Sequence, residues 1–256
     1  MPAWMPDAPW YVLAALPLVI LAAYTMFGAT GFGSAIIAVP VLAHFFPLTF
    51  AVPLVTALDA VATTQASWRQ WRHADFGELR QLFPPMLGGI ACGITLLVNL
   101  PRAPALLALG VFVAGYGVYL VTGKREWKAM RPFWAWPLGL IGGAVSVLFG
   151  TGGPIYMVYL SARIHDKTVL RATSSVLVTL SVVIRATGFI VTGLLLQLPV
   201  LAAAGALLPF MLGGFALGNR LHFAMSREGV MRVIALLLIA NGALLGMRAI
   251  ELLSGS

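Results

Sequence analysis

Residues 84–93 read PPMLGGIACG, and residues 209–218 read PFMLGGFALG. Seven of the ten aligned positions are identical at a constant offset of 125 residues, and the same offset pairs Arg102 with Arg227. Small residues coincide often in membrane helices because close packing favours them. This window also matches Pro and Met, which that tendency does not explain. The two stretches therefore predict that the chain is a duplicated unit.

The composition predicts that both copies lie in a membrane. Of 256 residues, 60% are hydrophobic and only 9% are charged, with a mean hydropathy of +0.95, whereas an average soluble domain has about 25% charged residues. This excludes soluble enzymes and disordered proteins. The net charge of +8 comes from basic residues in short loops between apolar runs, which is typical of membrane topology and excludes a nucleic-acid partner. A single cysteine, Cys92, argues against a disulfide framework.

Hydropathy predicts ten apolar segments, five in each half. They lie near residues 10–27, 34–46, 50–68, 82–99, 104–122, 133–149, 154–162, 171–195, 200–219 and 230–250. A helix needs about 20 apolar residues to cross the hydrocarbon core, so segments 34–46 and 154–162 are too short to cross comfortably. Each follows a Gly-rich break and forms either a broken helix or a re-entrant hairpin. The predicted fold is an all-α, polytopic transmembrane bundle.

The basic residues predict how the two halves are oriented. Thirteen of the sixteen lie in four stretches, namely 69–81, 123–131, 163–171 and 220–232. If these stretches are cytoplasmic, the loop at 69–81 lies inside, whereas its counterpart at 196–199 has no basic residue and lies outside. The halves are thus predicted to be inverted repeats, with both termini outside. The first repeat spans 1–122, a cytoplasmic linker spans 123–132, and the second repeat spans 133–256.

The two Gly-rich breaks are the leading candidates for a binding site. Glycine lets the backbone leave helical geometry and expose its N–H groups, and half-helices that begin there direct positive dipole ends at an anionic ligand. The candidate substrate-binding residues at the breaks are Thr30, Gly31, Gly33, Ser34, Thr151, Gly152, Gly153 and Pro154. The alternative is that these glycines only allow close packing at a kink.

Two charged residues lie near the centres of predicted spans, Asp59 in 50–68 and Arg185 in 171–195. A charge there costs at least about 2.5–3.5 kcal/mol on insertion scales, which predicts a function for both. We expect Arg185 to bind an anionic substrate and Asp59 to orient it or to couple protons. A structural ion pair remote from any pathway is the alternative. Helical spacing predicts four further pathway-lining residues on the same faces, namely Thr56, Thr63, Ser174 and Ser181.

The Thr-Gly-Phe-Gly-Ser stretch at 30–34, the Gly-Thr-Gly-Gly-Pro stretch at 150–154 and the duplicated Pro-x-Met-Leu-Gly-Gly segments together resemble the TauE/SafE sulfite exporter family. The resemblance covers about residues 10–250. It implies a bacterial inner-membrane carrier of sulfur-containing anions such as sulfite or sulfonates. It also implies a role for the Gly-rich residues at both breaks, but it assigns none to Asp59 or Arg185.

The predicted function is a secondary transporter of small anions by alternating access, with sulfite, organosulfonates or related sulfur oxyanions as substrates. An anion channel and a carrier of small carboxylates remain open, and outside transport so do a membrane assembly partner and an intramembrane enzyme. The predicted partners are a small anionic substrate, the lipid bilayer, protons as a candidate coupling ion and a second copy in a candidate homodimer. We predict no enzymatic activity, no cofactor and no metal.

Overall fold

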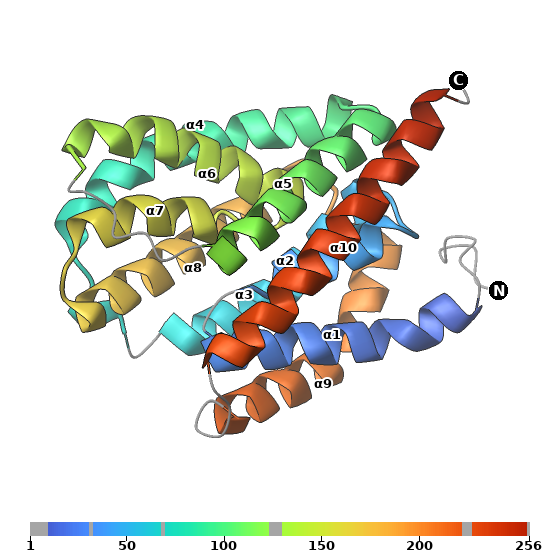
Figure 1. The fold of residues 1–256 in the computed structure, drawn as a ribbon, viewed down its shortest axis with the longest axis horizontal. Coiled ribbons are helices and arrows are strands. Elements are labelled where there is room, and N and C mark those ends of the chain that lie inside the picture. The colour runs from blue at the N-terminus through green and yellow to red at the C-terminus, as the bar shows by residue number, and fades with distance from the viewer. Residues whose placement is uncertain (1–9, 31–32, 68–69, 123–129, 222–226, 255–256) are drawn as a thin grey trace.

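The computed structural model describes residues 10–30, 33–67, 70–122, 130–221 and 227–254, which form a helical bundle (Figure 1). Over these ranges each of the ten predicted segments corresponds to one α-helix, so the all-α prediction is confirmed. The α-helices are α1 (Trp10–Thr30), α2 (Ser34–Ala43), α3 (Leu48–Ser67), α4 (Phe76–Asn99), α5 (Arg102–Thr122), α6 (Ala135–Phe149), α7 (Gly153–Arg163), α8 (Lys167–Val191), α9 (Leu198–Leu221) and α10 (Arg227–Ser254). Two short 3-10 helices, η1 (Trp71–His73) and η2 (Pro132–Trp134), lie in the connections.

Helices α4 and α8 begin several residues before the apolar segments that predict them. Asp75 caps α4 by accepting a hydrogen bond from the backbone N–H of Glu78 at 3.2 Å. Asp166 caps α8 by accepting bonds from the N–H groups of Thr168 (2.7 Å) and Val169 (3.0 Å). The backbone bonds from Val169 and Thr168 also lower the pKa of the Asp166 carboxyl. Because these caps sit in polar turns, hydropathy alone places the helix starts too late.

Six helices are long and apolar enough to cross a membrane, counted over the described residues. These windows are Leu48–Gln65, Phe76–Asn99, Arg102–Thr122, Pro132–Phe149, Lys167–Val191 and Leu198–Arg220. Helices α2 and α7 have only 10 and 11 residues, so each rises about 15 Å, or half of the hydrocarbon thickness. Neither short helix is therefore long enough to cross a membrane by itself.

Helix α7 turns back toward the end of the bundle at which α6 begins. The start of α6 lies beside the first half of α4, where a Cβ on Gly139 would be 3.1 Å from the carbonyl oxygen of Leu82. After Gly150, which has φ +78°, α7 runs to Arg163, whose guanidinium pairs with Glu78 in the first turn of α4 at 2.7 Å. Helices α6 and α7 therefore form a hairpin with both outer ends near the start of α4.

Helices α1 and α2 form a second hairpin, which enters from the opposite end. Gly33, with φ +103°, precedes α2, and α2 ends at His44. The His44 ring pairs with Asn241 at 3.0 Å, and its carbonyl accepts a hydrogen bond from Arg248 near the end of α10. The start of α1 and the end of α10 lie toward the same side of the bundle (Figure 1). The two hairpins thus point at each other.

The helix pairs are exchanged between the two halves of the chain. The first helix of each half packs against the fourth helix of the other, so α1 pairs with α9 and α6 with α4, while α5 pairs with α10 and α3 with α8. Corresponding glycines make these contacts. A Cβ on Gly89 of α4 would lie 2.1 Å from the Leu140 carbonyl oxygen, and one on Gly214 of α9 would lie 2.4 Å from that of Leu21. The orientation of either half relative to a membrane stays a prediction.

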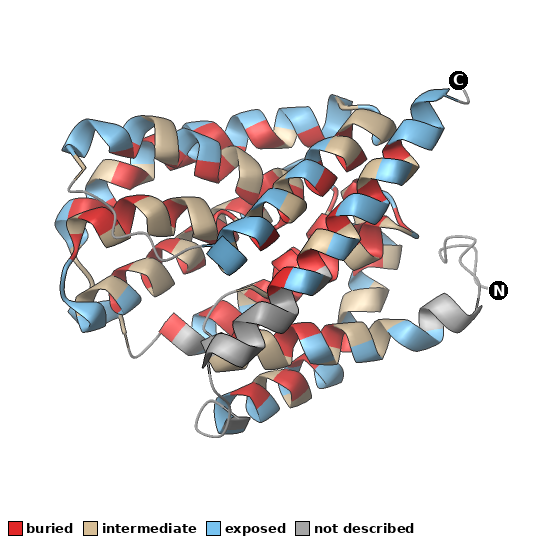
Figure 2. Cartoon of the chain, in the orientation of Figure 1, coloured by how far each residue is buried: buried red, intermediate tan, exposed pale blue. Residues whose placement is uncertain are grey.

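Helix α3 is the most enclosed of the six long apolar helices. In its membrane-length window 67% of the residues are buried, against 22–39% in the other five. Figure 2 shows exposed residues along the outer faces of α4, α5 and α10, and many of them are apolar, such as Val111 and Leu244. Apolar outer faces suit contact with lipid, and α3 with its partner α8 lies at the core that they surround.

We expect substitutions at equivalent glycines of the two repeats to have similar effects on stability. Gly89→Ala and Gly214→Ala should each destabilise the protein by about 1–3 kcal/mol, since their methyl groups would overlap a facing carbonyl. Gly88→Ala and Gly213→Ala are the controls, because a Cβ at Gly88 would have only ordinary contact and one at Gly213 nothing within 4 Å. Thermal unfolding in detergent measures the effect. Equal melting temperatures for Gly89→Ala and Gly88→Ala would contradict this packing.

Candidate functional site

The tips of the two hairpins meet in the middle of the bundle. The turn after α6 is so close to α2 that a Cβ on Gly150 would lie 2.8 Å from the Cβ of Ala35. The backbone at Gly33 and Gly150 has positive φ, which glycine adopts without strain. Two breaks that are far apart in the sequence are thereby brought into direct contact.

A small cavity lies where the two tips meet α3 and α8. Nine predicted site residues line it, namely Gly33, Ser34, Asp59, Thr63, Thr151, Gly152, Gly153, Ser181 and Arg185. Its volume is about 30 Å³, room for about two water molecules. The structure thus brings both Gly-rich breaks and both intramembrane charges to one place.

The other residues predicted at the breaks lie at the ends of the short helices. Thr30 is the last residue of α1, and Pro154 lies in the first turn of α7, where it is partly exposed. Gly31 lies outside the described residues. The N-cap residues of α2 and α7, Gly33 and Gly152, provide no side-chain cap. Two helix N-termini thus begin at the cavity without a capping side chain.

The four predicted pathway residues divide into two groups. Thr63 and Ser181 line the cavity. Thr56 is buried one turn before Asp59 on α3, but its hydroxyl donates to the carbonyl of its own helix at Val52. Ser174 donates to the carbonyl of Arg171 and lies eleven residues before Arg185, about 16 Å along α8. A pathway that includes Ser174 would therefore have to extend well beyond the cavity.

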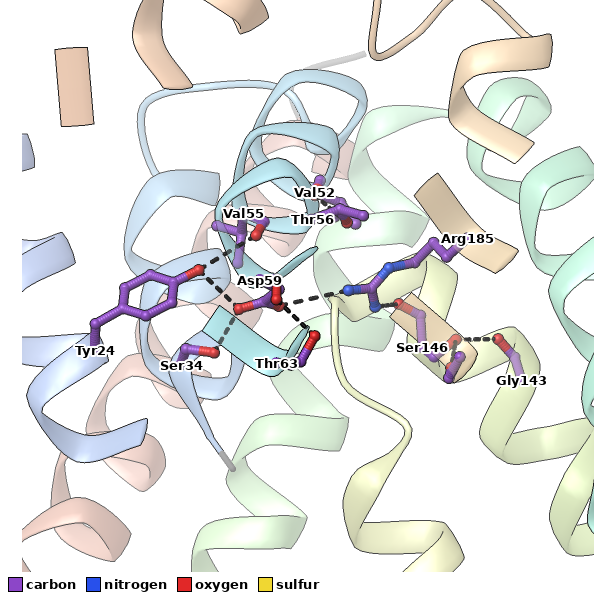
Figure 3. A network of polar contacts seen from close by, with 11 residues as sticks. Tyr24, Ser34, Val52, Val55, Thr56, Asp59, Thr63, Gly143, Ser146 and Arg185 are labelled. Carbon is purple, nitrogen blue, oxygen red and sulfur yellow. Dashed lines mark hydrogen bonds and ion pairs between the residues drawn. The ribbon is translucent and has the colours of Figure 1, made fainter. Parts of the chain in front are cut away.

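Asp59 is held by two hydroxyl groups on other helices (Figure 3). Its Oδ1 accepts a hydrogen bond from Tyr24 on α1 at 2.7 Å and from Ser34 on α2 at 2.8 Å. Asp59 is 3% exposed and lies on the enclosed helix α3. Charge-assisted hydrogen bonds of this kind stabilise a buried carboxylate. One carboxylate oxygen thus joins α3 to both arms of the first hairpin.

Arg185 has far fewer partners, although it is 1% exposed. Its Nη1 donates to the backbone carbonyl of Ser146 on α6, and its Nη2 lies 3.5 Å from Oδ2 of Asp59 (Figure 3). That separation is an ion pair but too long for a good hydrogen bond. The Nε and Nη2 atoms have no hydrogen-bond partner among the described residues. A guanidinium with unused donors at a cavity wall is suited to bind an anion.

Sequence reasoning missed three residues of this site, Tyr24, Ser146 and Tyr156. Each lies on a helix that borders a Gly-rich break, and each is buried. Single polar residues of this kind carry no sequence signal, since tyrosine and serine are common in membrane helices. Sequence reasoning also missed a cluster at the outer end of α7, where Glu78 accepts from Tyr159 at 2.7 Å and pairs with Arg163. Within the described ranges no three His, Cys, Asp or Glu side chains gather to hold a metal ion.

A comparison with known proteins matches nearly the whole chain to one protein family. The family model described as sulfite exporter TauE/SafE matches residues 16–245. A curated relative, the probable inner membrane transporter protein TsaS of Comamonas testosteroni, is 25% identical over 190 residues, which cover 74% of this chain and 80% of that protein. No solved structure matches the chain.

We expect the two buried charges to depend on each other for stability. Asp59→Asn removes the charge opposite Arg185 and should cost about 3–5 kcal/mol, since it leaves an unpaired buried cation. The double variant Asp59→Asn with Arg185→Gln should recover part of that loss. Chemical or thermal unfolding of the parent protein, the two single variants and the double variant measures the coupling in a double-mutant cycle. Additive losses in the double variant would show that the pair is not coupled.

Proposed function

This chain belongs to the sulfite exporter TauE/SafE family, and on that premise we propose that it carries sulfite, organosulfonates or related sulfur oxyanions across a bacterial inner membrane. It is a multi-pass membrane protein of a transporter family. The observation that carries the proposal is Arg185, a buried arginine with two unused donor atoms at the wall of a central cavity. A buried, incompletely paired cation is costly and is typically functional in a membrane protein.

We propose that transport proceeds by alternating access. The α1–α2 and α6–α7 hairpins reach the cavity from opposite ends of the bundle, and each is tied at its outer end by polar contacts. His44 at the end of α2 contacts α10, and Arg163 at the end of α7 contacts Glu78 of α4. Opening the contact at one end while the other stays closed would expose the cavity to one side at a time.

The same model assigns the sides of the membrane. The predicted basic stretches 69–81, 123–131, 163–171 and 220–232 would face the cytoplasm. The start of α1 and the end of α10 would then face the periplasm, and Figure 1 draws both toward the same side of the bundle. In this orientation, the contact between Arg163 and Glu78 lies at the cytoplasmic end and that of His44 at the periplasmic end.

An anion channel is the second candidate within transport. The two hairpins favour a carrier, because they reach the cavity from opposite ends and their outer contacts can open one at a time. Flux in proteoliposomes distinguishes the two mechanisms. A carrier saturates with substrate concentration and shows exchange of substrate across the membrane, whereas a channel conducts in proportion to the gradient.

Arg185→Lys tests the role of the guanidinium in binding. Lysine keeps the charge beside Asp59 but loses the planar fork, so we expect affinity for sulfite and methanesulfonate to fall about tenfold or more while the protein stays folded. Arg102→Lys, an exposed position at the start of α5, is the matched control and should leave affinity unchanged. Isothermal titration of purified protein measures both. Unchanged affinity in Arg185→Lys and Arg185→Ala for every anion that the parent protein binds would exclude this role.

Asp59 is the proposed proton-coupling group. An anion that binds Nη2 of Arg185 competes with Oδ2 of Asp59, only 3.5 Å away, and the released carboxylate is then free to accept a proton. We expect initial flux in proteoliposomes to respond to pH in the compartment opposite the substrate, and this response to disappear in Asp59→Asn. Rates are compared per folded transporter, since the substitution also affects stability. The same pH response in Asp59→Asn and the parent protein would assign the coupling elsewhere.

A further inference from the structure

We infer that Tyr156 and one edge of Arg185 form a three-donor subsite that selects anions with three oxygens on one central atom over planar carboxylates. The inference rests on the proposed function, since it concerns which anions the central cavity accepts. Tyr156 and Arg185 both line that cavity, on α7 and α8. Neither sequence motifs nor the comparisons assign a role to Tyr156.

The first part of the subsite is an unused edge of the guanidinium. The N–H groups of Nε and one terminal nitrogen, Nη2, point the same way and match two oxygens of an oxyanion. In Arg185 these two atoms are the ones without a hydrogen-bond partner, whereas Nη1 is occupied by the carbonyl of Ser146. The arginine is thus hydrogen-bonded through Nη1, and its Nε–Nη2 edge is left with only the 3.5 Å ion pair between Nη2 and Asp59, which an arriving anion would replace.

The second part is the hydroxyl of Tyr156. Tyr156 is 1% exposed, and no hydrogen bond of its hydroxyl to another described residue has good geometry. The hydroxyls of Ser146 and Ser181 lie near it but bond to each other at 3.2 Å. A buried hydroxyl without a partner is rare because it loses its bonds to water. Tyr159, one turn further on the same helix, donates its hydroxyl to Glu78 at 2.7 Å. Tyr159 thus has a well-formed hydrogen bond and Tyr156 does not, which leaves the Tyr156 hydroxyl able to donate to a molecule that enters the cavity.

Two glycines fix the position of the Tyr156 ring. A Cβ on Gly142 of α6 would lie 2.3 Å from Cε1 of the ring, and one on Gly152 would lie 2.9 Å from Cε2. The ring is therefore packed directly against backbone on both edges. A side chain held in this way loses little freedom when a ligand binds, which favours both affinity and selectivity.

Three donors favour a pyramidal or tetrahedral head group. Two oxygens of a sulfite or sulfonate can accept from the Nε–Nη2 edge, and the third lies out of their plane, where the Tyr156 hydroxyl can donate to it. A carboxylate has only two oxygens, so on the same edge it has no third oxygen out of the plane for the Tyr156 hydroxyl. Sites that hydrogen-bond one substrate group discriminate against analogues that lack it. The subsite should therefore prefer a sulfonate to the carboxylate of equal charge.

Methanesulfonate and acetate test this selectivity, since each is a monoanion with one methyl group. Isothermal titration of the purified full-length protein should give at least about tenfold tighter binding of methanesulfonate. Tyr156→Phe should remove most of that preference by weakening methanesulfonate about tenfold and leaving acetate unchanged, as expected for a lost hydrogen bond to an anion. Its melting temperature without ligand should change little, because the hydroxyl that it removes makes no well-formed hydrogen bond, and Ser146 and Ser181 keep their bond to each other.

Tyr159→Phe is the matched control, since it removes a hydroxyl outside the cavity lining from the same helix and should leave the ratio of the two affinities unchanged. Equal affinity of the parent protein for both anions would overturn the inference, as would an equal loss for both in Tyr156→Phe. Either result leaves an anion site intact. Failure of the parent protein to bind any sulfur oxyanion would instead contradict the proposed function.

Discussion

The ion pair between Asp59 and Arg185 is the constraint on which the centre of this molecule depends. Each charge lies on a long apolar helix, and neither is tolerable in hydrocarbon without the other. Their 3.5 Å contact requires α3 and α8 to lie side by side. The bonds of Asp59 to Tyr24 and Ser34 then bring both arms of the α1–α2 hairpin against α3. A single buried pair thus positions the helices that build the cavity.

The glycine contacts make that placement possible. Without a hydrophobic force between helices in lipid, helices associate through close packing of small residues. Gly89 and Gly93 let α4 approach α6, and Gly214 and Gly218 let α9 approach α1. Each hairpin is therefore backed by a long helix from the other half of the chain, which fixes where its tip lies. The two tips can meet at the cavity because both are supported in the same way.

Much of the fold can be predicted from the sequence, because apolar runs and repeated glycines each follow from a strong physical requirement. The sequence predicts the ten α-helices, including which two of them are short, and the proximity of Asp59 to Arg185. The starts of α4 and α8 could not be predicted from hydropathy, since Asp75 and Asp166 extend them through polar turns. The partners Tyr24 of Asp59 and Ser146 of Arg185 could not be predicted either. Which hydroxyl faces a carboxylate depends on how α1, α6 and α7 rotate about their axes, and helical periodicity is weak in segments that are apolar on nearly every side.

The two members of the ion pair differ in how many of their polar atoms have hydrogen-bond partners. Asp59 accepts two short hydrogen bonds on one oxygen, whereas Arg185 has one backbone bond and a loose contact. In the proposed mechanism, an anion that pairs with Nη2 of Arg185 replaces the contact with Oδ2 of Asp59, while Oδ1 keeps both of its hydroxyl donors. Those donors come from the first hairpin, and the carbonyl partner of Arg185 comes from the second. If an anion replaces Asp59 at Arg185, as proposed, it therefore acts on the contact that links the two tips.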